Sequence, residues 1–156
     1  MKTAFVTGGS RGIGLAIVKE LGQNGYQIAL MATKTEEHYP GSSAALKTAG
    51  ITYLWIAGDV ASEEDRRQAL NQAVERFGRI DVLVNNAGVA PKVRADLLSM
   101  TQESYDHVMN TNTRANMFMT QAVARQMIAQ EQQGAKRGTI INISSCSSEV
   151  SSINRG

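Results

Sequence analysis

Short apolar runs alternate along the chain with longer segments in which apolar residues recur at helical spacing. Each apolar run has the length of a buried strand, and the segments between the runs have the length of helices. The predicted strands are Thr3–Thr7, Gln27–Met31, Thr52–Ala57, Asp81–Asn85 and Thr139–Ser144. The predicted helices lie near Gly12–Asn24, Ser42–Thr48, Ser62–Phe77 and Tyr105–Gln132, with a break in the last one near Asn110–Asn112. This alternation predicts an α/β fold, a doubly wound parallel sheet with helices on both faces.

Local signals agree with these boundaries. A glycine follows each periodic segment, as is typical of helix C-termini, at Gly25, Gly50, Gly78 and Gly134. Ser62 followed by three acidic residues is typical of a helix N-terminus, because the serine oxygen caps free N–H groups and the acids favour the positive end of the helix. The length of 156 residues is enough for one domain with a hydrophobic core, so residues 1–156 are predicted to form a single domain.

The segment from Thr7 to Gly14 reads Thr-Gly-Gly-Ser-Arg-Gly-Ile-Gly and joins the first predicted strand to the first predicted helix. A strand, a glycine-rich turn and a helix in this order grip the pyrophosphate in Rossmann-type folds, because the helix N-terminus offers unpaired N–H groups. Gly8 permits the tight turn, Gly12 a close approach of phosphate, and Gly14 close packing of helix on strand. The spacing Gly-x-x-x-Gly-x-Gly differs from the commoner Gly-x-Gly-x-x-Gly, but the strand and helix around it predict a dinucleotide cofactor.

Small or polar residues also follow three later strands, in the segments Gly58–Val60, Asn85–Gly88 and Ser144–Ser148. Ligands bind at the carboxyl ends of the strands in open α/β sheets. We therefore expect these segments and the glycine-rich turn to meet in one crevice. Asp59 has a second interpretation, as a turn or helix-cap residue.

Composition narrows the choice of partners. The net charge of +2, without a run of Lys or Arg and with few aromatic residues, argues against nucleic acid and anionic membranes as partners. No apolar stretch is long enough to span a bilayer. The single cysteine, Cys146, excludes an internal disulfide framework and suits a reducing cytoplasm. Only His38 and His107 could join it, so no metal site is predicted, and we expect a soluble, cytoplasmic domain.

Four motifs stand in register along the chain: the glycine-rich turn, Asn85–Gly88, Asn112 and Ile141–Ser145. Together they resemble the short-chain dehydrogenase/reductase family, and within it the chain is most similar to the 3-oxoacyl-(acyl-carrier-protein) reductase-like members. The resemblance covers essentially the whole chain. It implies a Rossmann-type fold, a nicotinamide dinucleotide cofactor, oxidoreductase activity and a homo-oligomer with the helix around Asn112–Gln132 in the interface.

The resemblance also implies roles for individual residues. The turn wraps the pyrophosphate and the adenosine ribose, and Asp59 accepts a hydrogen bond from the exocyclic amine of adenine. Asn85 ties neighbouring strands together. Ser145 is the implied catalytic serine, whose hydroxyl hydrogen-bonds the substrate carbonyl oxygen. Asn112 is the implied holder of a water in the proton relay, with a plain helix-kink residue as the alternative and Asn110 or Asn116 as competing positions. The implied cofactor-binding residues are Gly8, Gly9, Ser10, Arg11, Gly12, Ile13, Gly14, Thr33, Asp59, Val60, Asn86, Ala87 and Gly88.

Charge after the second strand indicates which cofactor is preferred. NAD-preferring enzymes place an acidic residue there to hold the ribose 2′-hydroxyl. Here Met31, Ala32, Thr33 and Lys34 carry no carboxylate, and the first acid is Glu36. Arg11, with Lys34 as a second candidate, could pair with a 2′-phosphate, although Arg11 could also be a solvated loop residue. The pattern favours NADP over NAD.

One expected element of the reaction is missing. The resemblance implies a tyrosine that gives its proton to the carbonyl oxygen and a lysine four positions later that lowers the pKa of that tyrosine. The chain has Tyr26, Tyr39, Tyr53 and Tyr105, and none has a lysine at that spacing. We therefore expect the chain to be the front part of a reductase, with its sheet truncated after the fifth strand, and to be inactive by itself.

Two functions remain open at this stage. The first is an NADP-dependent oxidoreductase that interconverts a ketone and a secondary alcohol, with a 3-oxoacyl thioester as the implied substrate and a sugar or small polyol ketone as runner-up. The second is a non-catalytic dinucleotide-binding module that acts as a sensor or interaction partner. The absent tyrosine and lysine keep the second function in play.

Overall fold

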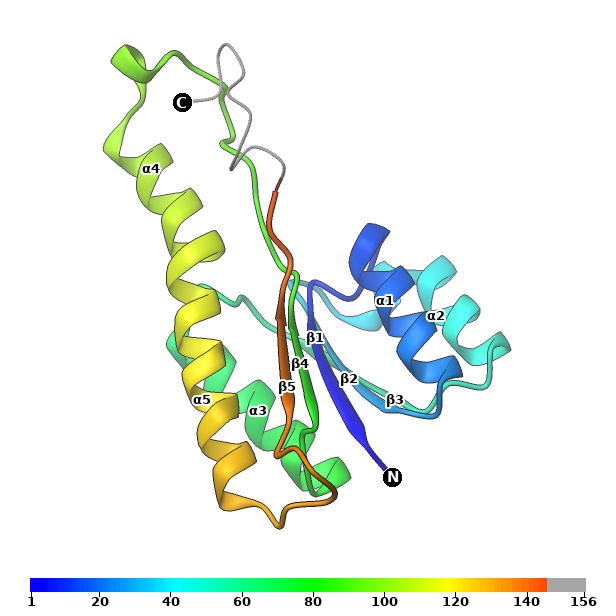
Figure 1. Ribbon diagram of the computed structural model, residues 1–156. Coiled ribbons are helices and arrows are strands. Elements are labelled where there is room, and N and C mark those ends of the chain that lie inside the picture. Colours follow the sequence, from blue (N-terminus) through cyan, green and yellow to red (C-terminus); the bar gives the residue numbers. More distant parts are fainter. Residues whose placement is uncertain (146–156) are drawn as a thin grey trace.

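A parallel five-stranded sheet forms the centre of the computed structural model, which describes residues 1–145 (Figure 1). Its strands lie in the order β3-β2-β1-β4-β5, and all four neighbouring pairs are parallel. The strands are β1 (Thr3–Thr7), β2 (Gln27–Ala32), β3 (Tyr53–Ala57), β4 (Val82–Asn85) and β5 (Thr139–Asn142). The predicted fold class is confirmed. From β1 the chain adds β2 and β3 on one side and then β4 and β5 on the other. Open sheets of this type bind ligands at the point where the strand order changes direction in this way.

Helices cover both faces of the sheet, with α1 and α2 on one face and α3 and α5 on the other, and α4 extends beyond the carboxyl ends of the strands (Figure 1). Two short 3₁₀ turns, η1 (Glu36–His38) and η2 (Leu97–Ser99), lie in the connections. The α-helices are α1 (Gly12–Gln23), α2 (Pro40–Thr48), α3 (Glu63–Phe77), α4 (Gln102–Met109) and α5 (Ala115–Ala129).

The strands are buried on both faces, as parallel sheets require. In β1, Phe5 packs into the core beneath α3 and α5, whereas its neighbours Ala4 and Val6 pack into the core beneath α1. The same alternation continues in β4, where Leu83 faces the first core and Val82 and Val84 face the second. This alternation fixes which side chains of each strand face α1 and which face α3 and α5.

The boundaries of α3 follow the capping signals. Ser62 is the N-cap, and its hydroxyl accepts a hydrogen bond from the Asp65 N–H at 3.2 Å. Gly78 ends the helix with φ of 78°, a left-handed conformation that favours glycine. Ala69 and Ala73 form the buried face of the helix.

The long helix predicted over Tyr105–Gln132 differs in detail. It begins earlier, at Gln102, and ends earlier, at Ala129, and the expected break is a π-helical turn, η3 (Asn110–Arg114), between α4 and α5. Thr101 explains the earlier start, because its hydroxyl accepts from the Ser104 N–H at 3.2 Å and caps the helix. A π-turn adds one residue to a helical turn, is rare, and is frequent at functional sites.

Two kinds of feature are absent from residues 1–145. None of the helices found there combines the length and the apolar character needed to span a bilayer. The same residues contain no group of three or more His, Cys, Asp or Glu side chains arranged to hold a metal ion.

Candidate functional site

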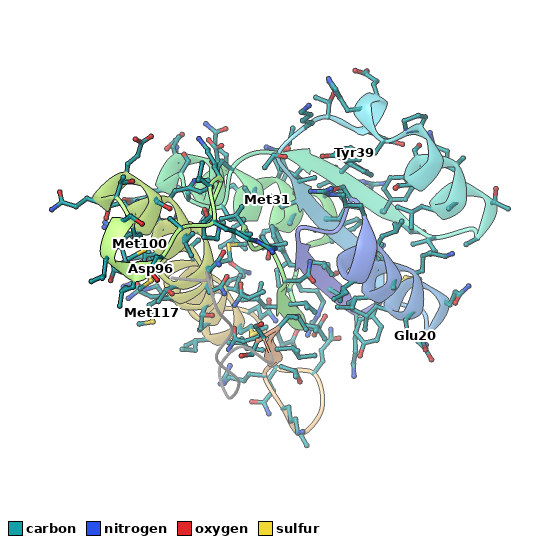
Figure 2. All side chains as sticks on the ribbon, turned by 90° about the horizontal axis from the view of Figure 1, so that it is seen from above. Glu20, Met31, Tyr39, Asp96, Met100 and Met117 are labelled. Atoms are coloured by element: carbon teal, nitrogen blue, oxygen red, sulfur yellow. The ribbon has the colours of Figure 1, made fainter. Side chains whose placement is uncertain are left out.

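A cleft of about 560 Å³ opens at the carboxyl ends of the strands. Figure 2 looks down on this edge, with Met31 between Tyr39 on the α2 side and the helices α4 and α5 on the other side. Every predicted cofactor-binding residue except Gly9 lines the cleft. Gly58 also lines the cleft, as expected for the segment Gly58–Val60, and the prediction missed six further lining residues, which are Met31, Ala32, Tyr39, Val89, His107 and Thr111.

The glycine-rich turn is packed so closely that Gly8, Gly9 and Gly14 have no room for a Cβ atom. Gly8 has φ of +67°, and its N–H donates to the Met31 carbonyl at 2.8 Å. A Cβ atom on Gly14 would lie 2.1 Å from the Gly8 carbonyl oxygen, so only glycine lets α1 start this close to the turn. Gly9 packs beneath the turn, where a Cβ would lie 2.9 Å from Leu30 Cβ and 3.1 Å from Val18 Cγ2. Gly9 therefore serves packing, while its neighbours form the wall of the cleft.

The loop after β4 is bound to the glycine-rich turn through Thr7 and Asn86. The Thr7 hydroxyl oxygen accepts hydrogen bonds from the backbone N–H groups of Asn86 and Ala87, both at 3.0 Å. The Asn86 side-chain amide donates to the carbonyls of Thr7 and Gly8 at 3.0 and 3.2 Å. These four bonds join segments almost 80 residues apart in sequence and hold the two walls of the cleft at a fixed separation.

Asn85 points away from the cleft and joins three elements, as the resemblance implies. Its side chain is buried, and its amide donates to Thr120 Oγ1 on α5 and to Asn142 Oδ1 on β5, both at 2.9 Å. A buried amide with two partners on different elements fixes the register of β4, β5 and α5 relative to one another.

Asn112 lies in the π-turn and clasps the backbone of Val89. Its side-chain oxygen accepts from the Val89 N–H at 2.8 Å, and its amide donates to the Val89 carbonyl at 2.9 Å. Asn116 in turn donates to the Asn112 carbonyl at 2.8 Å. Asn112, and neither Asn110 nor Asn116, therefore joins the helix break to the cleft wall, and its role in a proton relay stays a prediction.

We predict that Asn112→Asp lowers the free energy of unfolding by about 1–3 kcal/mol, because a second acceptor would then face the Val89 carbonyl and leave it unpaired. Urea unfolding followed by circular dichroism measures the change. Asn110→Asp is the matched control, since Asn110 is an exposed asparagine of the same turn. Equal losses in the two variants would contradict a specific role for the Asn112 clasp.

His107 and Thr111 stand four residues apart and line the cleft from the α4 side. His107 also lines a second pocket of about 370 Å³, together with residues of the loop before α4. Neither residue was predicted as part of the site. The helical spacing of four, which places both side chains on one face, is the sequence signal that could have linked them.

Asp59 combines both of its predicted interpretations. It lines the cleft, and one carboxylate oxygen accepts from the Ala61 N–H at 2.9 Å, as in a turn. Its own N–H donates to the Asp65 carboxylate at 2.7 Å. Its role towards adenine stays a prediction.

Arg66 supports the same corner of the cleft from behind. Only 6% of the residue is exposed, and its guanidinium donates to the Val60 carbonyl at 2.6 Å. The guanidinium carbons of Arg66 and Arg114 lie 5.9 and 5.7 Å from the centre of the Phe118 ring, and burial lowers the pKa of Arg66. Nothing in the acidic sequence around Arg66 signals that it is buried.

The remaining predicted residues differ in position. Arg11 is exposed at the rim of the cleft, and Thr33 lines it, whereas Lys34 is not part of its wall. Ser145 is exposed and lies three residues beyond the end of β5, outside the lining of the cleft. Residues 146–148 of the predicted serine-rich segment, including Cys146, lie outside the described residues.

Comparisons with known proteins agree with this geometry. The profile of the short chain dehydrogenase family matches residues 2–156. The 3-oxoacyl-(acyl-carrier-protein) reductase of Staphylococcus aureus (strain Mu50) is 34% identical over 145 residues, which cover 92% of this chain and 56% of the relative. The L-rhamnose 1-dehydrogenase (NAD(P)(+)) of Azotobacter vinelandii is 37% identical over 155 residues, which cover 96% of this chain and 57% of the relative.

A solved structure gives the same result in three dimensions. The crystal structure of 3-oxoacyl-(acyl-carrier-protein) reductase from Brucella melitensis in complex with NAD superposes with a TM-score of 0.90 at 34% identity. The match covers 99% of this chain and 59% of that one. The profile match, the sequence identity and the shared architecture around the cleft show that the chain belongs to the short-chain dehydrogenase family.

Proposed function

We propose that this chain is the cofactor-binding part of an NADP-dependent oxidoreductase that interconverts a ketone and a secondary alcohol by hydride transfer. The observation that carries the proposal is the cleft, whose wall contains the glycine-rich turn and the segments that follow β2, β3 and β4. Membership of a dehydrogenase family favours this function over a non-catalytic sensor or interaction module.

The residues of the cleft fit a dinucleotide. The N-terminus of α1 borders the cleft, and its first turn contains no acidic side chain, so the positive end of the helix dipole is free to attract a pyrophosphate. We assign the pyrophosphate to the turn from Gly8 to Gly14, the adenine to Asp59 and Val60, and a ribose to the loop Asn86–Gly88.

A nicotinamide dinucleotide in this cleft supplies or accepts the hydride at the carbonyl carbon. We assign to Ser145 the hydrogen bond that stabilises charge developing on the substrate oxygen, and to Asn112 the positioning of a water for proton transfer. No tyrosine of this sequence precedes a lysine by four positions, so the chain alone lacks the pair expected to give the proton. The chain by itself should therefore bind the cofactor without turning over substrate.

The substrate we propose is a 3-oxoacyl thioester, supported by the names of the Staphylococcus and Brucella relatives. The Azotobacter relative acts on a sugar, which keeps a sugar as the second candidate. The test uses the full-length protein that carries this sequence. Loss of NADPH absorbance with an acetoacetyl thioester supports the first substrate, whereas NADP reduction with L-rhamnose and no reaction with the thioester would replace it by the second.

Preference for NADP rests on Arg11, which we assign to the 2′-phosphate. We predict that Arg11→Ala weakens NADPH binding about tenfold and NADH binding less than about twofold, because a charge-assisted contact to phosphate is lost. Fluorescence titration with both cofactors gives the two dissociation constants. Arg76→Ala is the control, since Arg76 is an exposed arginine in the last turn of α3. An equal loss for both cofactors would show that Arg11 does not recognise the 2′-phosphate.

We also propose that the protein assembles with copies of itself through the outer side of η3 and α5. Three large apolar side chains, Met117, Phe118 and Ile128, are exposed there by 41–68%. An exposed apolar face of this kind is typical of a protein–protein interface. Sedimentation of the full-length protein would reveal a monomer if this proposal is wrong.

A further inference from the structure

The carboxylate of Glu36 is held by three side chains that come from α2 and β3. We call these four residues, Glu36, Ser43, Lys47 and Tyr53, the Glu36 cluster. The Tyr53 hydroxyl donates to Glu36 Oε1 at 2.6 Å, the Ser43 hydroxyl donates to the same oxygen, and the Lys47 ammonium lies 3.1 Å from it. Together these partners, led by Ser43 and Tyr53, lower the pKa of Glu36 to about 2. The Glu36 carboxylate is therefore ionised at neutral pH and already bound by its three partners.

Glu36 is the first acidic residue after β2, and it lies between two residues of the cleft wall, Thr33 and Tyr39. A carboxylate that follows the second strand of a dinucleotide-binding fold accepts from the ribose 2′-hydroxyl and repels a 2′-phosphate. Glu36 is thus the first carboxylate after β2 that could oppose a 2′-phosphate, and in this structure it is not itself part of the cleft wall.

The segment around Glu36 is held at both ends. Before it, the Trp55 indole N–H donates to the Lys34 carbonyl at 3.0 Å. After it, the rings of Tyr39 and Trp55 lie 5.4 Å apart, and the Ser42 hydroxyl donates to the Ser10 carbonyl of the glycine-rich turn at 2.7 Å. These contacts leave the orientation of the Glu36 side chain to be set by its own cluster.

We propose that Ser43, Tyr53 and Lys47 are positioning residues that turn the Glu36 carboxylate away from the ribose and so permit a 2′-phosphorylated cofactor. The inference rests on the proposed use of NADP. The Glu36 cluster favours NADP by keeping a negative charge away from the 2′-phosphate, in addition to the attraction supplied by Arg11.

The test releases the carboxylate and then neutralises it, in the full-length protein that carries this sequence. In Ser43→Ala/Tyr53→Phe, two of the three partners are removed and the freed Glu36 is expected to weaken NADPH binding about fivefold by charge repulsion, with NADH binding changed less than about twofold. Adding Glu36→Gln to this double variant should restore NADPH affinity to within about twofold of the original protein, because no charge remains to repel the phosphate.

Recovery of NADPH affinity by Glu36→Gln distinguishes an effect of the Glu36 charge from a loss of loop structure. If the double variant only disordered the loop, removing the charge would not restore NADPH binding. Tyr26→Phe is the matched control, because Tyr26 directly precedes β2, at the edge of the sheet opposite the cleft. The single variant Tyr53→Phe, which keeps the Ser43 and Lys47 contacts, gives a smaller change in the same direction if the double variant is too unstable to titrate.

Two outcomes would overturn the inference: equal weakening of both cofactors without recovery in the triple variant, or no change in the double variant. A native protein that prefers NADH would instead contradict the proposed use of NADP. In that case the ratio of NADPH affinity to NADH affinity still tests the role of the Glu36 cluster. The ratio is higher in the triple variant than in the double variant only if the released Glu36 charge reaches the cofactor.

Discussion

Replacing Gly14 by alanine is expected to weaken cofactor binding strongly and to destabilise the fold. The added Cβ would lie 2.1 Å from the Gly8 carbonyl oxygen and 2.5 Å from Asn86 Nδ2, distances at which atoms repel strongly. Neither neighbour can move easily, because Gly8 is bonded to the Met31 carbonyl and the Asn86 amide already donates to Thr7 and Gly8. Helix α1 must therefore shift away from the turn.

We expect this shift to lower the free energy of unfolding by about 3 kcal/mol, as overpacking against rigid backbone does. Dinucleotide affinity should fall at least about a hundredfold, because a displacement of about 1 Å misplaces the groups that hold the pyrophosphate. Urea unfolding and fluorescence titration measure the two effects.

Gly41→Ala is the matched control for Gly14→Ala. Gly41 lies in the first turn of α2, and a Cβ there would meet nothing within 4 Å. The substitution should leave cofactor binding unchanged and raise the free energy of unfolding by up to about 1 kcal/mol, because alanine favours the helix more than glycine does. If Gly14→Ala behaved like this control, close packing of α1 on the turn would not be what Gly14 provides.

The sequence predicts the strands and helices of this fold well, because their positions depend on local signals. Apolar runs of strand length become β1 to β5, and the capping serine Ser62 and the terminal Gly78 mark the ends of α3. The packing of Gly14 against the Gly8 carbonyl is also local, whereas Gly9 packs against Leu30 of β2 and Gly8 against the loop after β4. The errors in the strands and α-helices lie at their ends, as in the helix predicted from Tyr105, where the sequence analysis did not identify Thr101 as the cap. The 3₁₀ turns η1 and η2 were not predicted.

The contacts that shape the site could not be predicted in this way, because their partners lie far apart in sequence. The Asn112 clasp on Val89 spans 23 residues, and the Thr7 bonds to the loop after β4 span about 80. Arg66 stands in an acidic helical segment, and only the packing of Phe118 and the Val60 carbonyl around it show why it is buried. The Glu36 cluster likewise joins residues from three elements.

The two ends of the strands have different roles, one in the cleft and the other in stability. The carboxyl edge carries the cleft, with its glycines and polar loops. The amino edge carries an ion pair between Arg79 and Asp81, whose side chains are 11% and 10% exposed and approach to 2.7 Å. Asp81 also accepts from the Thr3 N–H at 2.9 Å, and its backbone bonds to Thr3 and Thr139 join β1, β4 and β5 where these strands begin.

Asp81→Asn is therefore expected to lower the free energy of unfolding at neutral pH by about 3 kcal/mol, because it leaves the Arg79 guanidinium without its charge partner in a poorly hydrated place. Cofactor affinity should be unchanged, since the residue lies at the edge opposite the cleft. Glu75→Gln, at an exposed acid of α3, is the control and should alter neither quantity. Urea unfolding and titration with NADPH measure them side by side.

The loss caused by Asp81→Asn should depend on pH in a definite direction. Burial by itself would raise the pKa of Asp81, but hydrogen bonds from Arg79 and Thr3 outweigh it and lower the pKa below its ordinary value of 3.8. A group whose pKa is lower in the folded state stabilises the protein fully above its unfolded pKa and loses that contribution as the pH falls through the folded value. The difference in the free energy of unfolding between the native protein and Asp81→Asn should thus stay constant from neutral pH to about pH 5 and shrink below about pH 4. A difference that instead grew on acidification would mean that the Asp81 carboxylate is not held in its charged form by Arg79.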